Sequence, residues 1–131
     1  MGFSTYGFYS IACADKPGTK QIDPEMVMVR ARVRKHLTNL RQRFPSLADA
    51  KILTLPNRDY GYRLIVAKAV WAEALKELAK EQTWSNFKNE AARNQGKTGP
   101  DYVRALHDVW EIMYGLQEHE KRTDRLNRIP E

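Results

Sequence analysis

Cysteine is almost absent from this chain of 131 residues, in which Cys13 is the only one. A single thiol excludes an internal disulfide, and no group of Cys and His residues has the spacing of metal ligands. The lack of disulfides is typical of proteins in a reducing compartment. The sequence therefore predicts a cytoplasmic protein with no metal site and no cofactor.

Long apolar runs and the common catalytic motifs are also missing. No segment approaches the roughly 18 apolar residues that a membrane-spanning helix needs, and residues 1–6 resemble neither a signal peptide nor a myristoylation site. There is no Walker loop, no GxGxxG motif and no paired-carboxylate motif. We expect no membrane partner, and none of these catalytic chemistries is indicated.

Positive charge is what the chain has in excess, with 22 Lys and Arg against 16 Asp and Glu and a formal net charge of +6. Residues 1–97 carry this excess, whereas residues 98–131 are mildly acidic. A basic surface attracts polyanions over about a Debye length, so nucleic acid or an acidic protein surface is an expected partner. The alternative is a basic surface that only contacts solvent.

Four segments have the alternation or the β-branched composition of strands: residues 7–14, 26–32, 51–55 and 60–67. In the second segment Val27, Val29 and Ala31 share one face, which is expected to be buried. The alternation of the last segment is ambiguous, because either Leu64 or Ile65 could face the core.

Helical periodicity covers four other segments: residues 33–44, residues 69–81, residues 85–94 and a final helix that begins at Pro100. Pro45 is expected to end the first of them. The order of segments predicts an α+β fold: a four-stranded antiparallel sheet in ββα-ββα order, helices packed on one face, and a long C-terminal helix. Residues 1–119 form one domain in this prediction, and residues 120–131 form a polar, mobile tail.

Four stretches carry a resemblance to a known family: Val29-Arg30-Ala31-Arg32 with His36-Leu37, Asp59-Tyr60-Gly61-Tyr62-Arg63, Asn86-Phe87-Lys88, and Ala105-Leu106-His107-Asp108-Val109-Trp110. On these residues the chain resembles a family of small uncharacterised proteins of bacteria and their phages, over most of residues 7–117. The resemblance implies no activity, cofactor or catalytic residue, because no biochemical function is established for that family. Occurrence in phages would imply a host-directed or accessory role.

A basic face of the sheet is the strongest candidate for a binding surface. Arg30 and Arg32 alternate with the expected core residues of their strand and so belong on the opposite face. The predicted surface comprises Arg30, Arg32, Arg34, Lys35, Arg58 and Arg63. A sheet face with Arg and Tyr can hold single-stranded nucleic acid through phosphate contacts and base stacking. The alternative is a solvated face, or a face covered by the final helix.

Further candidates for partner contacts are Tyr60, Tyr62, Lys88 and His107. The two tyrosines flank Gly61 and belong either to a recognition loop or to the core beside a bulge. Lys88 follows Phe87, which either docks a partner or fills the core.

His107 and Glu111 lie four residues apart on the final helix, so they share a face and can pair. No nucleophile stands beside them in the sequence, and a histidine on a helix surface is the simpler interpretation. Catalytic residues are therefore predicted to be absent.

Together these features predict a non-enzymatic binding protein whose basic surface recognises nucleic acid or another polyanion. One alternative is an inhibitor encoded by a phage or mobile element that binds a host protein, as anti-CRISPR and other anti-defence proteins do. A second alternative is a small enzyme that uses His107 and Glu111. The sequence leaves the oligomeric state open.

Overall fold

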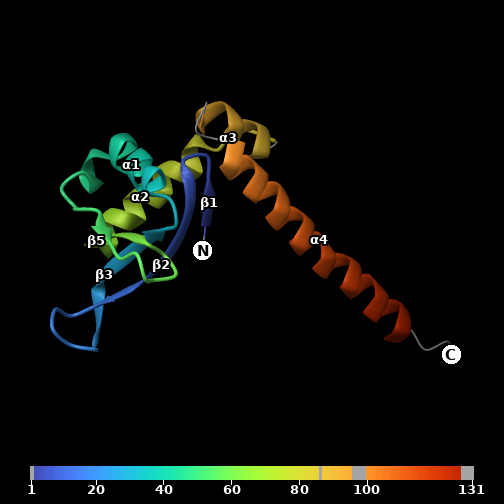
Figure 1. Cartoon of the computed structure of the whole chain (residues 1–131), viewed down its shortest axis with the longest axis horizontal. Coiled ribbons are helices and arrows are strands. Elements are labelled where there is room, and N and C mark those ends of the chain that lie inside the picture. The colour runs from blue at the N-terminus through green and yellow to red at the C-terminus, as the bar shows by residue number, and fades with distance from the viewer. Residues whose placement is uncertain (1, 86, 96–99, 128–131) are drawn as a thin grey trace. The chain divides into compact units, whose positions relative to one another are not determined.

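The structure is a computed structural model that describes residues 2–85, 87–95 and 100–127 (Figure 1). The chain forms two compact units, residues 1–87 and residues 88–131. The boundary between them lies inside the segment 1–119 that the sequence predicts as one domain.

The first unit contains an antiparallel sheet, and its strands are β1 (Gly2–Ser4), β2 (Gly7–Asp15), β3 (Ile22–Ala31), β4 (Leu53–Thr54) and β5 (Tyr62–Ala67). Their order across the sheet is β1-β2-β3-β5-β4, and all neighbouring strands are antiparallel. The predicted four-stranded antiparallel sheet is confirmed in β2 to β5. The short strand β1, which pairs with β2, was not predicted.

The β2–β3 hairpin is longer than the sequence pattern indicates. The pattern predicts a polar connection up to Glu25, but β3 already begins at Ile22, opposite Asp15. The turn is closed by the Lys16 amide, which donates to the Gln21 carbonyl over 2.8 Å. Polar residues therefore continue the ladder here, because backbone hydrogen bonds do not require apolar side chains.

The helices are α1 (Arg34–Arg43), α2 (Lys68–Glu81), α3 (Phe87–Gln95) and α4 (Pro100–Asn127), with a 3-10 turn, η1 (Pro45–Leu47), after α1. These are the four predicted helices. As expected, α1 ends just before Pro45, and the Phe44 amide caps it by donating to the Leu40 carbonyl over 2.8 Å. The last helix is longer than expected, since residues 120–127 of the predicted tail belong to α4.

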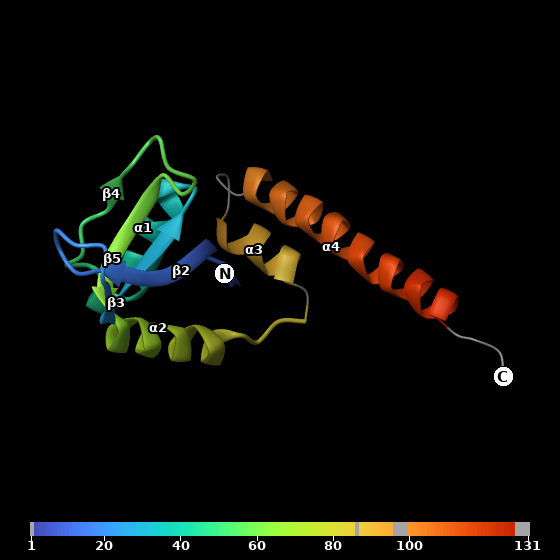
Figure 2. The same cartoon turned by 90° about the horizontal axis from the view of Figure 1, so that it is seen from below.

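One face of the sheet carries the core of the first unit. Both α1 and α2 pack on this face, which Figures 1 and 2 let the reader follow. The core residues are Tyr9, Val27, Val29, Ala31, Leu64 and Val66 from the sheet, Leu37, Leu40 and Phe44 with Leu47 from the α1 region, and Trp71 and Ala74 from α2. The ambiguous alternation of β5 is thereby resolved, because Leu64 is buried and Ile65 is 41% exposed.

β2 also approaches α1 closely, at Gly7 and His36. A Cβ atom added at Gly7 would lie 2.3 Å from Cγ of His36, closer than any real contact of that kind. His36 is buried, and the Phe8 amide donates to its Nδ1 over 3.3 Å. The Tyr9 hydroxyl donates to the His36 carbonyl over 2.6 Å. Only glycine leaves room for this imidazole beside the strand.

Candidate anion-binding site

The opposite face of the sheet gathers four arginines, and we call Arg30, Arg32, Arg58 and Arg63 the arginine cluster. Arg30 on β3 lies directly opposite Arg63 on β5 in the strand register. Both alternate with core residues, so their side chains leave the sheet on the face away from α1 and α2. Arg32 follows β3, and Arg58 lies in the loop between β4 and β5. Strand pairing thus brings together side chains that are far apart in the sequence.

Tyr60 holds two of these guanidinium groups. The Cζ atom of Arg32 lies 4.1 Å from the centroid of the Tyr60 ring, and Cζ of Arg30 lies 5.0 Å from it. Tyr60 is only 6% exposed, whereas Arg32 is exposed. Its ring is therefore not the exposed recognition residue that a Tyr-rich turn indicates. Instead it fixes the arginines through cation–π contacts, each typically about 0.5–2 kcal/mol.

Neutral acceptors on the neighbouring strands orient two of the arginines. Arg30 Nη2 donates to Oγ of Ser10 over 2.7 Å, and Arg63 Nη1 donates to Sδ of Met28 over 3.4 Å. The Nε atoms of Arg30 and Arg63 are buried and have no hydrogen-bond partner within the described residues. A guanidinium has five N–H donors, so the Ser10 hydroxyl and the Met28 thioether leave donors of Arg30 and Arg63 without an acceptor among the described residues.

Carboxylates do not neutralise the arginine cluster. In the part of the chain that the structure describes, none of its four members forms an ion pair, although ion pairs occur on α1, α2, α3 and α4. Burial, together with the charges of Arg30 and Arg58, lowers the pKa of Arg63. An arginine still remains charged at neutral pH. The site therefore has an excess of positive charge that an external anion can relieve.

Arg34 and Lys35 belong to a different place. They occupy the first turn of α1 and are exposed. Neither shares the hydrogen bonds or cation–π contacts that join the arginine cluster, as far as the described residues go. The predicted six-residue surface thus divides into a cluster of four and a separate pair of exposed charges.

The other predicted contact residues are scattered. Tyr62 is half-buried and packs against the core on the helix side of the sheet, as its structural interpretation required. Phe87 is half-buried, and its ring lies 6.5 Å from that of Trp84. Asn86 and the side chain of Lys88 lie outside the described residues.

His107 forms the predicted pair with Glu111, with 3.2 Å between Nε2 and Oε1. Both side chains are about half exposed, at 49% and 62%. The ring of His107 stacks on Trp110, and Trp110 stacks on Tyr114 at a centroid distance of 5.2 Å. The pair therefore lies on a solvated part of the helix surface.

Cys13 and Arg63 leave the sheet on opposite faces. Arg63 points away from the helices, whereas Cys13 pairs with Val27 on the helix side, near the far end of the hairpin. Cys13 is exposed there. No group of three metal-ligating side chains occurs among the residues that the structure describes.

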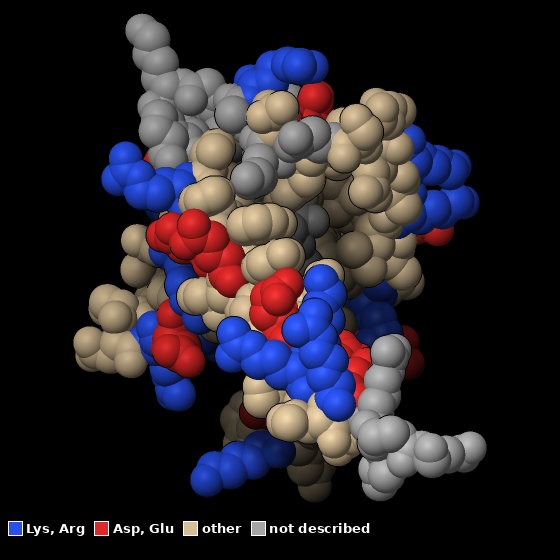
Figure 3. Space-filling model, turned by 90° about the vertical axis from the view of Figure 1, so that its right-hand side faces the viewer, with Lys and Arg blue, Asp and Glu red and all other residues tan. Residues whose placement is uncertain are grey.

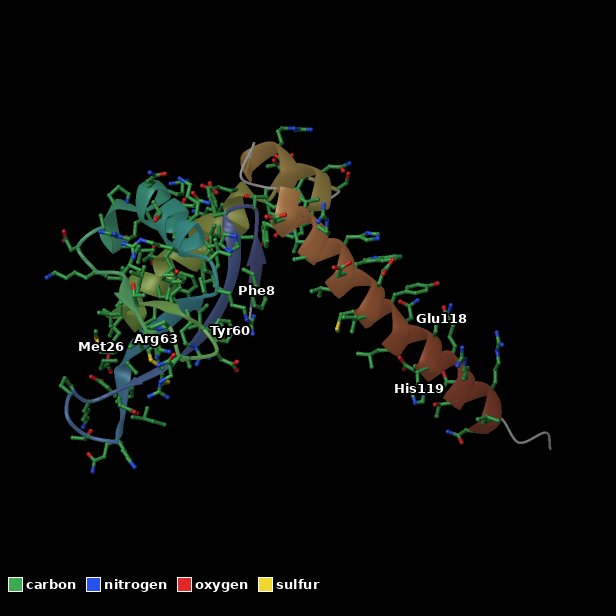
Figure 4. The ribbon with its side chains drawn as sticks, in the orientation of Figure 1. Phe8, Met26, Tyr60, Arg63, Glu118 and His119 are labelled. Atoms are coloured by element: carbon green, nitrogen blue, oxygen red, sulfur yellow. The ribbon has the colours of Figure 1, made fainter. Side chains whose placement is uncertain are left out.

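Three residues on the same face of the sheet as the arginine cluster were not among the predicted site residues. Ser10 and Met28 orient the arginines, and Phe8 is half-buried on β2 on the same side of the sheet. Figure 4 labels Phe8, Tyr60 and Arg63, which reach this region from three segments of the chain. The alternation of β2 could have indicated Phe8 and Ser10, since Tyr9 between them faces the core.

A second exposed feature lies on α4. The apolar stripe of this helix begins with Tyr102 and Leu106, which are buried, but Val109, Trp110, Met113 and Leu116 are 37%, 52%, 56% and 60% exposed. Side-chain contacts also occur on the polar side of this helix. Glu118, which is labelled in Figure 4, has a pKa below its usual range, because it accepts a hydrogen bond from Tyr114 and lies near the charge of Lys121.

A pocket of about 220 Å³ lies in the first unit between the β1–β2 turn and the end of α2. Leu75, Leu78 and Trp84 contribute to its wall. The Tyr6 hydroxyl beside it already donates to Glu81 Oε2 over 2.9 Å, and Glu81 also pairs with Arg43. Since these polar groups are engaged with each other, the pocket is a weaker candidate than the arginine cluster.

Net charge alone does not identify a binding surface in this protein. The face drawn in Figure 3 carries Lys and Arg among Asp and Glu, with uncharged residues between them. What distinguishes the arginine cluster is the local lack of carboxylate partners among the described residues.

Comparison of the chain with known proteins identifies no relative. No protein-family model, curated protein or solved structure matches the chain. Within the described residues, no helix is both long and apolar enough to cross a membrane.

Proposed function

We propose that this protein is a non-enzymatic binding protein that recognises phosphate-bearing polyanions, nucleic acid among them, through the arginine cluster. The observation that carries the proposal is the convergence of four arginines that have no carboxylate partner within the described residues. Guanidinium groups match phosphate oxygens in planar, bidentate geometry, and they retain their charge when partly desolvated. The net charge of +6 adds long-range attraction.

Preorganisation supports the same proposal. Tyr60 restrains Arg30 and Arg32, while Ser10 and Met28 restrain Arg30 and Arg63. Restrained side chains lose less rotamer entropy when a ligand binds, a saving of about 0.5–1.5 kcal/mol for each side chain that would otherwise be immobilised. A surface lysine without such contacts lacks this advantage.

Fluorescence anisotropy with a labelled DNA duplex of mixed sequence, titrated with salt, tests the proposal. Replacing Arg58 and Arg63 by Gln is expected to weaken binding and to reduce the log–log salt slope by about 2, because two phosphate contacts are lost. The matched control replaces Lys20 and Lys76 by Gln. This control removes the same charge at exposed positions outside the cluster.

Two results would count against the proposal. Absence of binding to the duplex, to its separated strands and to polyphosphate at low salt would refute it. Equal losses in the cluster variant and in the lysine control would show that only net charge matters. Thermal unfolding of each variant verifies that both remain folded.

The exposed stripe of α4 favours a second candidate function, an inhibitor from a phage or mobile element that binds a host protein. Trp110, Met113 and Leu116 are 52%, 56% and 60% exposed, and aromatic residues are enriched at the centres of protein interfaces. Capture of one defined protein from nuclease-treated bacterial lysate, lost with Trp110→Ala but kept with Arg63→Gln, would support this candidate. Capture that survives both substitutions would exclude α4 as the docking surface.

A further inference from the structure

The contact between Arg32 and Tyr60 has a free side. Tyr60 is buried and lies 4.1 Å from the Arg32 guanidinium, so one side of that group faces the ring. Arg32 itself is exposed. An exposed residue whose guanidinium lies against a buried ring can present the outer side of that group to solvent, while the ring beneath restrains its position.

A planar, exposed cation of this kind can stack on a nucleobase. Unpaired bases stack on arginine planes as well as on aromatic rings, and cation–π attraction adds to the contact. In a duplex, neighbouring bases already cover both faces of each base, so only the phosphates are accessible to Arg32. Stacking on Arg32 therefore favours the binding of single-stranded nucleic acid over the binding of a duplex.

Two further arginines that can contact phosphate lie next to Arg32. Arg30 contacts the same Tyr60 ring as Arg32, and it lies opposite Arg63 in the sheet. The guanidinium groups of Arg30 and Arg63 are therefore neighbours of the Arg32 guanidinium. A nucleotide combines a planar base and a phosphate at a similarly short spacing.

We infer that the arginine cluster binds single-stranded nucleic acid, with a phosphate held by Arg30 and Arg63 and an unpaired base stacked on the outer side of Arg32. This inference rests on the proposed function and names the ligand class within it. Deoxyribose and ribose strands share this chemistry, because the argument uses only the base and the phosphate.

The decisive variant is Arg32→Lys, which keeps the positive charge but removes the guanidinium plane. Its matched control is Arg34→Lys, the same exchange at an exposed arginine of α1 that lies outside the cluster and makes no cation–π contact with a ring in the described part of the chain. The probes are a labelled single-stranded DNA, the RNA of the same sequence, the corresponding DNA duplex, and polyglutamate of equal charge. Each affinity is measured by anisotropy at one salt concentration.

With the wild type, we expect tighter binding of the single strands than of the duplex or polyglutamate. Loss of one stacked base corresponds to at least roughly a five-fold weaker affinity of Arg32→Lys for single strands. The affinity for the duplex should stay within about two-fold, and Arg34→Lys should behave like the wild type with every probe. A difference between the DNA and RNA strands would show which of them the site prefers.

Three outcomes would overturn the inference while leaving the proposed function intact. These are duplex binding as tight as single-strand binding, an Arg32→Lys variant that binds single strands like the wild type, and an equal loss in Arg34→Lys. Polyglutamate binding as tight as that of the oligonucleotides would indicate an acidic protein partner instead. If no probe binds at low salt, the proposed function itself fails.

Discussion

Burial of His36 makes the stability of the first unit depend on pH in a specific way. The side chain is 5% exposed, and burial lowers its pKa from 6.5 to about 4. In the unfolded chain the same imidazole titrates near 6.5. Between these two values the unfolded chain binds a proton that the folded protein does not, so the free energy of unfolding falls as the pH falls.

The magnitude follows from the two pKa values. Above about pH 7.5 the imidazole is almost entirely neutral in both states, and the group has almost no effect on stability. At pH 5 it lowers the free energy of unfolding by about 2 kcal/mol relative to pH 7.5, and the loss approaches about 3 kcal/mol below pH 4. Against a typical total of roughly 5–15 kcal/mol, such a loss is readily measured.

The assay is urea unfolding followed by circular dichroism at pH 7.5 and pH 5, on the wild type and on His36→Asn. The asparagine carbonyl can still accept the hydrogen bond that the Phe8 amide gives to Nδ1, but it does not titrate. Carboxylates also titrate in this range, and they do so equally in both proteins. The difference between the two pH dependences is therefore assigned to His36.

An unchanged pH dependence in His36→Asn would refute the reasoning. A direct titration keeps the prediction testable even if that variant unfolds. If the NMR signal assigned to the His36 imidazole titrates near 6.5 in the folded wild type, this side chain is not desolvated, and the structural argument is wrong.

The remaining predictions concern packing. Gly7→Ala should lower the free energy of unfolding by about 1–3 kcal/mol, because its Cβ would overlap His36, whereas Gly61→Ala, whose Cβ meets nothing nearer than 3.9 Å, should be neutral or slightly stabilising. Equal effects of the two substitutions in urea unfolding would contradict the close contact. Leu64→Ala should destabilise by about 2–5 kcal/mol, and Ile65→Ala, at an adjacent but 41% exposed position, by well under half of that. If Ile65→Ala were the more damaging of the two, the assignment of the faces of β5 would be wrong.

The element types could be predicted because local patterns specify them. Val27, Val29 and Ala31 alternate with longer side chains, and that period of two belongs to a strand with one buried face. Similarly, Leu37 and Leu40 recur at helical spacing within α1. The α+β class and the placement of Arg30 on the face away from the helices follow from such periods alone.

Other features depended on tertiary contacts. The alternation of β5 fits two faces equally well, and pairing with β3 selected the one that buries Leu64. Strand β1 has too few residues for any periodicity, and it exists only because β2 offers a ladder to pair with. The extension of α4 to Asn127 is supported by local pairs such as Lys121–Glu118, which give a polar segment helical order without a core.

What the sequence determined by itself is the chemistry available to this protein: an excess of arginine and lysine, one thiol, and tyrosines beside Gly61. Only the tertiary structure decided how these groups combine. Strand pairing placed Arg63 opposite Arg30, and burial turned Tyr60 from an apparent contact residue into the support beneath Arg30 and Arg32. The physical reason is that charge and residue type are properties of the chain, whereas proximity and desolvation arise only when distant segments pack together.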